Sequence, residues 1–170
     1  MTGRLILELA DGSIPLLRSI EAADLEDLRR WKNDNRQAFF FKDEITAEGQ
    51  KKWYQGYLGR PNDYMFIVQA GTLRAGCVAF RLENGYADEY NIIASPEGRG
   101  QGHLKTAMRL MNSYVTAEHT RDVGLQVVVG NPAKGFYESC GFTEQSARDG
   151  FHQMRLSTAF SPLPYRVRRA

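Results

Sequence analysis

The sequence predicts a mixed α/β fold, with helices packed around a central and mostly antiparallel sheet. Strand-like segments separated only by short turns occupy residues 64–94. Beyond residue 94 the order becomes helix, strand, helix, so the strand "EYNIIA" is expected to lie parallel to the later strand "GLQVVV". The 170 residues have the composition of a globular protein, with 42% hydrophobic and 25% charged side chains. We therefore expect one domain spanning residues 1–170.

The first third of the chain predicts a hairpin followed by two helices. Apolar segments at 4–9 and 13–20 lie on either side of a turn that contains glycine. In residues 22–33, leucine and tryptophan recur at helical spacing, which predicts the first helix. Thr46 is a suitable N-cap for a second helix, and Gly59 is suited to end it.

The rest of the chain predicts three strands, a long helix and a final strand–helix–hairpin unit. Residues 64–70 and 75–82 form a predicted hairpin, and the strand at 86–94 follows an Asn-Gly turn. The long helix is indicated by apolar side chains on one face, at Leu104, Ala107, Met108, Met111, Tyr114 and Val115. The remaining predicted elements are a strand at 124–130, a helix at 132–140, and an antiparallel pair at 142–147 and 150–156.

A segment with almost no side-chain bulk, "PEGRGQG" (residues 96–102), separates the strand ending at Ala94 from the long helix. A helix N-terminus has unpaired N–H groups that attract anions, and glycines let this backbone approach a phosphate closely. With Arg99 present, the segment predicts a pyrophosphate cradle; a surface loop with helix-breaking glycines is the alternative. A P-loop is not supported, because Gly-Lys-Ser/Thr is absent, and Lys105 stands where a dinucleotide fingerprint has its third glycine.

A second motif, "NPAKGFYESCGF" (residues 131–142), follows this loop. Together, the patterns Arg99-x-x-Gly102 and Asn131-x-Ala133-x-x-Phe136-Tyr137-x-x-x-Gly141-Phe142 resemble the GNAT superfamily of N-acetyltransferases. The resemblance extends roughly from residue 64 to residue 142 in the order and type of elements. It departs at Leu104, where the acetyl-CoA loop of the family ends in glycine or alanine.

The resemblance implies a GNAT-like acyl-CoA N-acyltransferase fold with a splayed parallel pair, and acetyl-CoA as the cofactor. Free backbone groups of the splayed strand would bind the pantetheine arm and polarise the acetyl carbonyl, while the loop amides hold the pyrophosphate. Asn131 is also suited to cap the following helix, and the two roles are compatible. The expected cofactor-binding residues are Ile92, Ile93, Ala94, Arg99, Gly100, Gln101, Gly102, His103, Leu104, Lys105, Asn131 and Phe136.

The resemblance makes Tyr137 the expected general acid, which protonates the departing thiolate. Helical periodicity alone would make Tyr137 a core residue, but neighbouring Phe136 is able to do the packing and the phenol then requires a partner. For the base, Asp88 and Glu89 are adjacent on a predicted strand, so their side chains point to opposite faces. One carboxylate, or a water chain, accepts the proton of the amine; the alternative is that both carboxylates are solvated or paired with arginines.

The functional hypothesis is transfer of an acetyl group from acetyl-CoA to a primary amine by direct attack in a ternary complex. The segments "RRWKNDNRQAFF" and "ITAEGQKKW" are similar to family branches that acetylate nucleotide-linked amino sugars or protein N-termini. Arg36 and the aromatic run Phe39–Phe41 suit a nucleotide sugar, and a core-plugging loop explains the run equally well. The alternatives are a protein N-terminal or lysine acetyltransferase, and a non-catalytic acyl-CoA sensor domain.

Composition limits the partners and the compartment. A net charge of +2 does not predict nucleic-acid binding, and the basic tail "PYRVRRA" is expected to be a solvated terminus. No apolar run reaches the roughly 20 residues of a membrane span, and the first residues lack the features of a signal peptide. Cys77 and Cys140 make neither a disulfide framework nor a metal site, which favours the cytoplasm. A small-molecule amine is the expected partner, and a homodimer is possible.

Overall fold

The computed structural model describes residues 3–39 and 42–169, so Phe40 and Phe41 of the aromatic run lie outside the described residues. The strands are β1 (Leu5–Leu9), β2 (Leu16–Ser19), β3 (Asp63–Ala70), β4 (Leu73–Glu83), β5 (Tyr86–Ala94), β6 (Val123–Val128), β7 (Phe142–Arg148), β8 (Phe151–Leu156) and β9 (Tyr165–Arg169). The α-helices are α1 (Leu25–Asp34), α2 (Ala47–Leu58), α3 (His103–Glu118) and α4 (Ala133–Ser139). Short 3-10 turns are η1 (Ala22–Asp24), η2 (Arg36–Ala38) and η3 (Pro96–Gly98).

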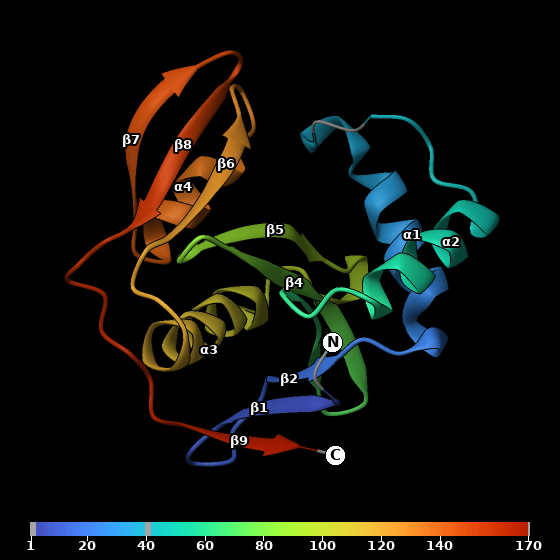
Figure 1. Ribbon diagram of the computed structural model, residues 1–170, viewed down its shortest axis with the longest axis horizontal. Coiled ribbons are helices and arrows are strands. Elements are labelled where there is room, and N and C mark those ends of the chain that lie inside the picture. The colour runs from blue at the N-terminus through green and yellow to red at the C-terminus, as the bar shows by residue number, and fades with distance from the viewer. Residues whose placement is uncertain (1–2, 40–41, 170) are drawn as a thin grey trace.

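The described strands form one sheet in the order β7-β8-β6-β5-β4-β3-β2-β1-β9 (Figure 1). Neighbouring strands are antiparallel except for β5 and β6, which are parallel. A helical crossover through α3 makes this parallel pairing possible, because two parallel strands cannot be joined by a tight turn. The expected mixed α/β fold is confirmed.

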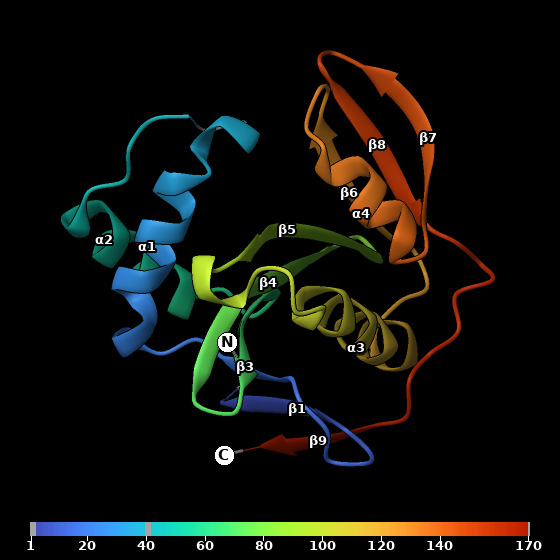
Figure 2. The ribbon, with the colours of Figure 1, turned by 180° about the vertical axis from the view of Figure 1, so that it is seen from behind.

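Alternate side chains of the central strands build two hydrophobic cores. On β3, Met65 and Ile67 pack with the buried faces of α1 and α2. Phe66 and Val68 point to the other face and pack with α3. Figure 2, seen from behind, brings α3 and α4 to the front. The period-two pattern of β3 therefore places one helical layer on each face of the sheet.

The helix ends follow their local chemistry. Thr46 caps α2 by accepting the N–H of Gly49 at 3.0 Å, and Gly59 follows the last residue of the helix, as expected. The first helix starts later than expected, because residues 22–24 form η1 and not the first α-helical turn. Asp24 fixes this turn by accepting the N–H of Glu21 at 2.8 Å. No helix in the described residues is long and apolar enough to cross a membrane.

The parallel strands β5 and β6 stay together over only part of their length. Residues Ala87–Glu89 pair with Val123–Leu125; further along, β6 remains with β8 and β5 remains with β4. The register of β4 against β5 shifts after Cys77, and nearby Asn91 has a left-handed φ of 47°. Such a bulge bends a strand and increases its twist, so β5 diverges from β6. The expected splayed pair is confirmed (Figure 1).

The C-terminal segment is an edge strand and not a free terminus. β9 pairs antiparallel with β1 along all five of its residues. Arg168 donates from Nε to Oε1 of Glu8 at 3.0 Å. The arginines of β9 are exposed, so the expectation of solvated side chains is correct, whereas the expectation of a simple tail is wrong. Backbone hydrogen bonding to β1 explains the difference, because it needs no apolar side chains.

Candidate active site

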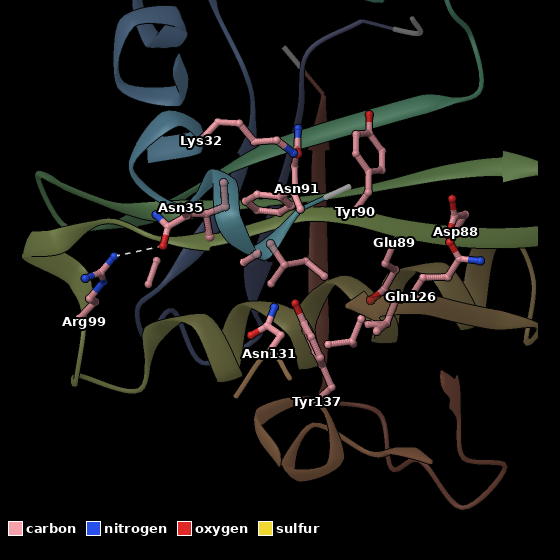
Figure 3. A pocket seen from close by; sticks show the side chains of 17 residues that line it. Lys32, Asn35, Asp88, Glu89, Tyr90, Asn91, Arg99, Gln126, Asn131 and Tyr137 are labelled. Carbon is pink, nitrogen blue, oxygen red and sulfur yellow. Dashed lines mark hydrogen bonds between the residues drawn. The ribbon is translucent and has the colours of Figure 1, made fainter. Parts of the chain in front are cut away.

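A cavity of about 580 Å³, here named the β5–β6 cavity, lies where these two strands diverge. The end of α1 and η2 line one side, β5 lies in the middle, and β6 and α4 line the other side (Figure 3). The predicted site residues that line it are Asp88, Glu89, Ile92, Ile93, Ala94, Arg99, Asn131 and Tyr137. The fold thus brings the predicted catalytic residues and part of the predicted cofactor set into one space.

The other predicted cofactor residues do not line this cavity. Residues 100–105 continue from Arg99 into the first turn of α3. Phe136 packs against the core on the α3 face, with its ring centroid 5.5 Å from that of Tyr137. Its position is that of a packing residue.

The glycines before α3 leave open space. Gly100 and Gly102 both have a φ of +77°, and a Cβ on either would meet nothing within 4 Å. Gly102 is the N-cap of α3, and no side chain caps this helix. The N–H groups of its first turn are therefore free to bind an anion. Gly98 is instead packed against β4, where a Cβ would lie 2.4 Å from the carbonyl oxygen of Ala75.

Arg99 and Asn35 meet at the mouth of the cavity. The guanidinium of Arg99 donates from Nη2 to Oδ1 of Asn35 at 3.4 Å (Figure 3). Asn35 is the C-cap of α1, so this contact links the loop before α3 to the end of α1. Arg99 is exposed, and its positive charge lies next to the open glycines.

Tyr137 extends from α4 into the cavity (Figure 3). Its hydroxyl donates to no other described residue. Burial, followed by the charge of Glu89 and that of Cys140, raises the pKa of the phenol well above its ordinary value of 10.0. The phenol therefore stays protonated at neutral pH and has a proton to donate.

The adjacent carboxyl groups of β5 point to opposite faces of the strand. Glu89 extends into the same space as Tyr137 (Figure 3) and is 3% exposed. Neither carboxyl oxygen of Glu89 has a hydrogen-bond partner among the described residues. Burial, followed by the charge of Asp88, raises the pKa of Glu89 well above 4.5. Asp88 shares the opposite face with Tyr90; burial raises the pKa of Asp88 too, and the positive charge of Arg81 partly offsets this.

Asn131 holds the start of α4 and lines the cavity at the same time. Its Oδ1 accepts the N–H of Ala133, the first residue of α4, at 2.9 Å, but the N-cap of this helix is Pro132, so Asn131 does not take the expected capping position. The side-chain nitrogen of Asn131 donates to no other residue in the described ranges. The side-chain amide of Asn131 is therefore available to donate a hydrogen bond to a ligand, on the side of the cavity formed by α4.

The cavity also contains polar residues that sequence reasoning missed. Lys32 donates from Nζ to Oδ1 of Asn91, and Tyr90 donates from its hydroxyl to Oδ1 of Asp63. Lys32 and Asn91 are 59 positions apart, and no local pattern predicts their contact. The sequence could have indicated the bulge at Asn91, because asparagine inside an apolar strand tolerates the left-handed conformation that a bulge requires.

Comparison with known proteins agrees with this geometry. Residues 16–143 match the family described as acetyltransferase (GNAT) domain, and no curated protein matches the chain. Spermidine N-acetyltransferase from Vibrio cholerae, solved in complex with CoA and spermine, is 25% identical with a TM-score of 0.71, covering 85% of this chain and 95% of that chain. A dodecameric structure of spermidine N-acetyltransferase from the same organism is 25% identical with a TM-score of 0.66, covering 82% and 91%. A domain from Methanocaldococcus jannaschii shares the fold at 18% identity and a TM-score of 0.72, covering 85% and 98%.

The splayed strands, the open helix N-terminus and the family match define a class of transferase that uses an acyl-CoA donor. The chain belongs to the GNAT family of acetyltransferases. It is an N-acetyltransferase that acts on amines, with acetyl-CoA as its cofactor.

Proposed function

We propose that the chain acetylates the primary amine of a small molecule by direct attack on acetyl-CoA in a ternary complex. The observation that carries this proposal is the phenol of Tyr137, which extends into the β5–β6 cavity with no hydrogen-bond partner among the described residues. A covalent acetyl-cysteine route has little support. Cys77 and Cys140 are buried, and burial raises the pKa values of their thiols to about 12 and about 11.

The cofactor is proposed to lie along the edge of β5 that β6 leaves open. Backbone groups of residues 92–94 bind the pantetheine arm and polarise the acetyl carbonyl. Backbone N–H groups from Arg99 to Lys105 bind the pyrophosphate, where Gly100 and Gly102 leave room for it. Asn131 donates its free amide N–H to the pantetheine arm from the α4 side.

The reaction forms a nitrogen–carbon bond and breaks the carbon–sulfur bond. The attacking amine loses one proton, and the departing sulfur gains one. Asp88, on the face of β5 that carries Tyr90, is proposed to accept the amine proton through a chain of water molecules. Tyr137 donates to the sulfur. Burial raises the pKa of Glu89 and so favours its uncharged form beside the departing thiolate.

Two acceptor classes have specific support. A nucleotide-linked amino sugar is supported by Phe39 in the cavity wall and by Arg36 in the adjacent exposed turn η2. A polyamine is supported by the solved spermidine N-acetyltransferase that holds CoA and spermine. We also propose self-association as a homodimer, supported by the dodecameric assembly of a solved neighbour. Light scattering tests this, and a monomer at all protein concentrations would contradict it.

A panel of amines tests the proposed function through release of free thiol from acetyl-CoA. The panel contains nucleotide-linked and free amino sugars, polyamines, amino acids, and peptides with a free N-terminus or lysine. With both substrates varied, a ternary complex gives intersecting double-reciprocal lines, whereas an acetyl-enzyme route gives parallel lines. No amine-dependent thiol release across the panel would contradict the function, and parallel lines would contradict direct attack.

A further inference from the structure

A second cavity, of about 480 Å³, lies between α1, α2 and the sheet and is here named the α1–α2 cavity. Much of its wall consists of apolar side chains, contributed by Leu28, Ile45, Trp53, Met65, Cys77 and Ile93. It shares Lys32, Tyr90, Asn91 and Ile93 with the β5–β6 cavity, so the two cavities adjoin at these residues. A molecule that occupies the α1–α2 cavity therefore reaches the place where β5 and β6 diverge.

Lys32 carries a positive charge at this junction. Its Nζ donates to Oδ1 of Asn91 and lies 3.6 Å from the centroid of the Phe39 ring. An ammonium group has three N–H donors. One of them donates to Asn91, and a second one faces the ring of Phe39. At least one donor remains for a ligand.

Among the residues that the structure describes, the charge of Lys32 has no acidic partner. No acidic side chain in the described ranges forms an ion pair with it, and Glu44 of the α1–α2 cavity is exposed. Cys77 faces it but is neutral at physiological pH, because burial raises the pKa of its thiol to about 12. Burial lowers the pKa of Lys32 to about 8, so the side chain is still mostly protonated at pH 7. The C-terminal end of the α1 dipole compensates this half-buried cation only in part.

We propose that Lys32 binds an anionic group on the acceptor, which is therefore a primary amine carrying a carboxylate or phosphate and an apolar body. This inference rests on the proposed function and narrows its acceptor class. The apolar body fills the α1–α2 cavity, the anionic group meets Lys32 at the junction, and the amine reaches the thioester at residues 92–94 of β5. The acceptor anion then supplies the counter-charge that the protein lacks.

The same charge acts against a polyamine. A polyamine would bring several ammonium groups into contact with an apolar wall and next to Lys32. Like charges brought together at a partly buried site weaken binding. The inference thus separates this chain from the spermidine N-acetyltransferases that share its fold.

Binding of amine-free analogues to the CoA-loaded protein tests the inference without turnover. The probes for calorimetry are 3-phenylpropionate, 3-phenylpropyl phosphate, the uncharged 3-phenyl-1-propanol, and spermidine. We expect one or both anions to bind at least about tenfold more tightly than the alcohol, since a hydrogen bond to a charged group is lost in the alcohol. Lys32→Met should remove the preference, Lys32→Arg should retain it, and Lys52→Met on exposed α2 should leave it unchanged. If Lys32→Met does not fold, Lys32→Gln is measured in its place.

Equal or undetectable binding of the anions and the alcohol, or a preference that survives Lys32→Met, would overturn the inference. Tighter binding of spermidine than of either anion would overturn it too. Turnover of L-phenylalanine against 2-phenylethylamine gives the matching kinetic test, because these amines differ only in the carboxylate. If panel amines support thiol release but those with a carboxylate or phosphate are not preferred, the proposed function stands. Only this inference is then overturned. If Lys32 had a purely structural role, Lys32→Met would lower the turnover of both amines equally. That result would also overturn the inference.

Discussion

The carboxyl group of Glu89 and the phenol of Tyr137 extend into the same cavity from two different elements, β5 and α4 (Figure 3). Burial raises the pKa values of both groups, and the charge of Glu89 adds to the rise at Tyr137. Burial thus favours the uncharged forms of both groups at the place where we propose that the thiolate departs.

Tyr137→Phe tests the proposed proton donor. The substitution removes one oxygen that donates to no described residue, so the melting temperature should change little. Loss of a general acid should lower the turnover number about 10²- to 10⁴-fold. Single-turnover kinetics with excess enzyme measure this step without interference from product release. A near-normal rate together with a lower melting temperature would assign Tyr137 to the core, and a chain that only senses acyl-CoA would show no turnover to lose.

Asp88→Asn and Glu89→Gln form a matched pair, because each replaces one carboxyl of β5 by an amide of the same shape. If Asp88 is the base, Asp88→Asn should lower kcat/KM by about 10²-fold or more at pH 7. Glu89→Gln should retain activity within about tenfold, because Gln resembles the neutral acid that burial favours. The measurement is kcat/KM for the best amine of the panel. The reverse order of the two effects would make Glu89 the base.

Glu89 should also impose a pH dependence on stability. Its pKa is higher in the folded protein than in the unfolded chain, where it is near 4.5. Between these two values the folded state holds a proton that the unfolded state has released, so the free energy of unfolding falls as the pH rises. Glu89→Gln should therefore gain stability relative to wild type from about pH 5 upward. Urea unfolding at several pH values measures this difference, and a constant difference would show that the pKa of Glu89 is ordinary.

Gly102→Val should weaken acetyl-CoA binding at the start of α3. The glycine has a φ of +77° and open space beyond it, so a valine side chain enters the room proposed for the phosphate. We expect at least about a tenfold loss of affinity in calorimetry. Gly12→Val is the control, because Gly12 has the same φ and the same open space in the β1–β2 turn. Equal affinity in the folded Gly102→Val variant would move the pyrophosphate site elsewhere.

The sequence predicted the elements that depend on local pattern. Thr46 caps its helix, and the strand–helix order after Ala94 produces the parallel pair. The alternation of Asp88 and Glu89 follows from the period of a strand, and the resemblance placed Tyr137 near them. These features could be predicted because each depends on neighbours in the chain or on a family motif.

The features that the sequence did not predict depend on contacts between distant segments. Lys32 fits the polar side of an amphipathic helix, and only the folded chain brings it to Asn91. The extent of the β5–β6 cavity could not be predicted either, because packing decides that Arg99 lines it while residues 100–105 do not. β9 was missed because it has only five residues, three of them arginine, so the alternation of Tyr165 and Val167 is too short to indicate a strand.

The pairing of β9 with β1 has a consequence during synthesis. Glu8 and Arg168, which meet across this pair, are 160 positions apart. At about 5–20 residues per second, the ribosome needs roughly 8–32 s to make the chain between them. During this interval the outer edge of β1 has exposed N–H and C=O groups, which can pair with another nascent chain. Premature release before β9 is made would therefore leave a fragment that holds the whole active site and yet has an open edge prone to aggregation.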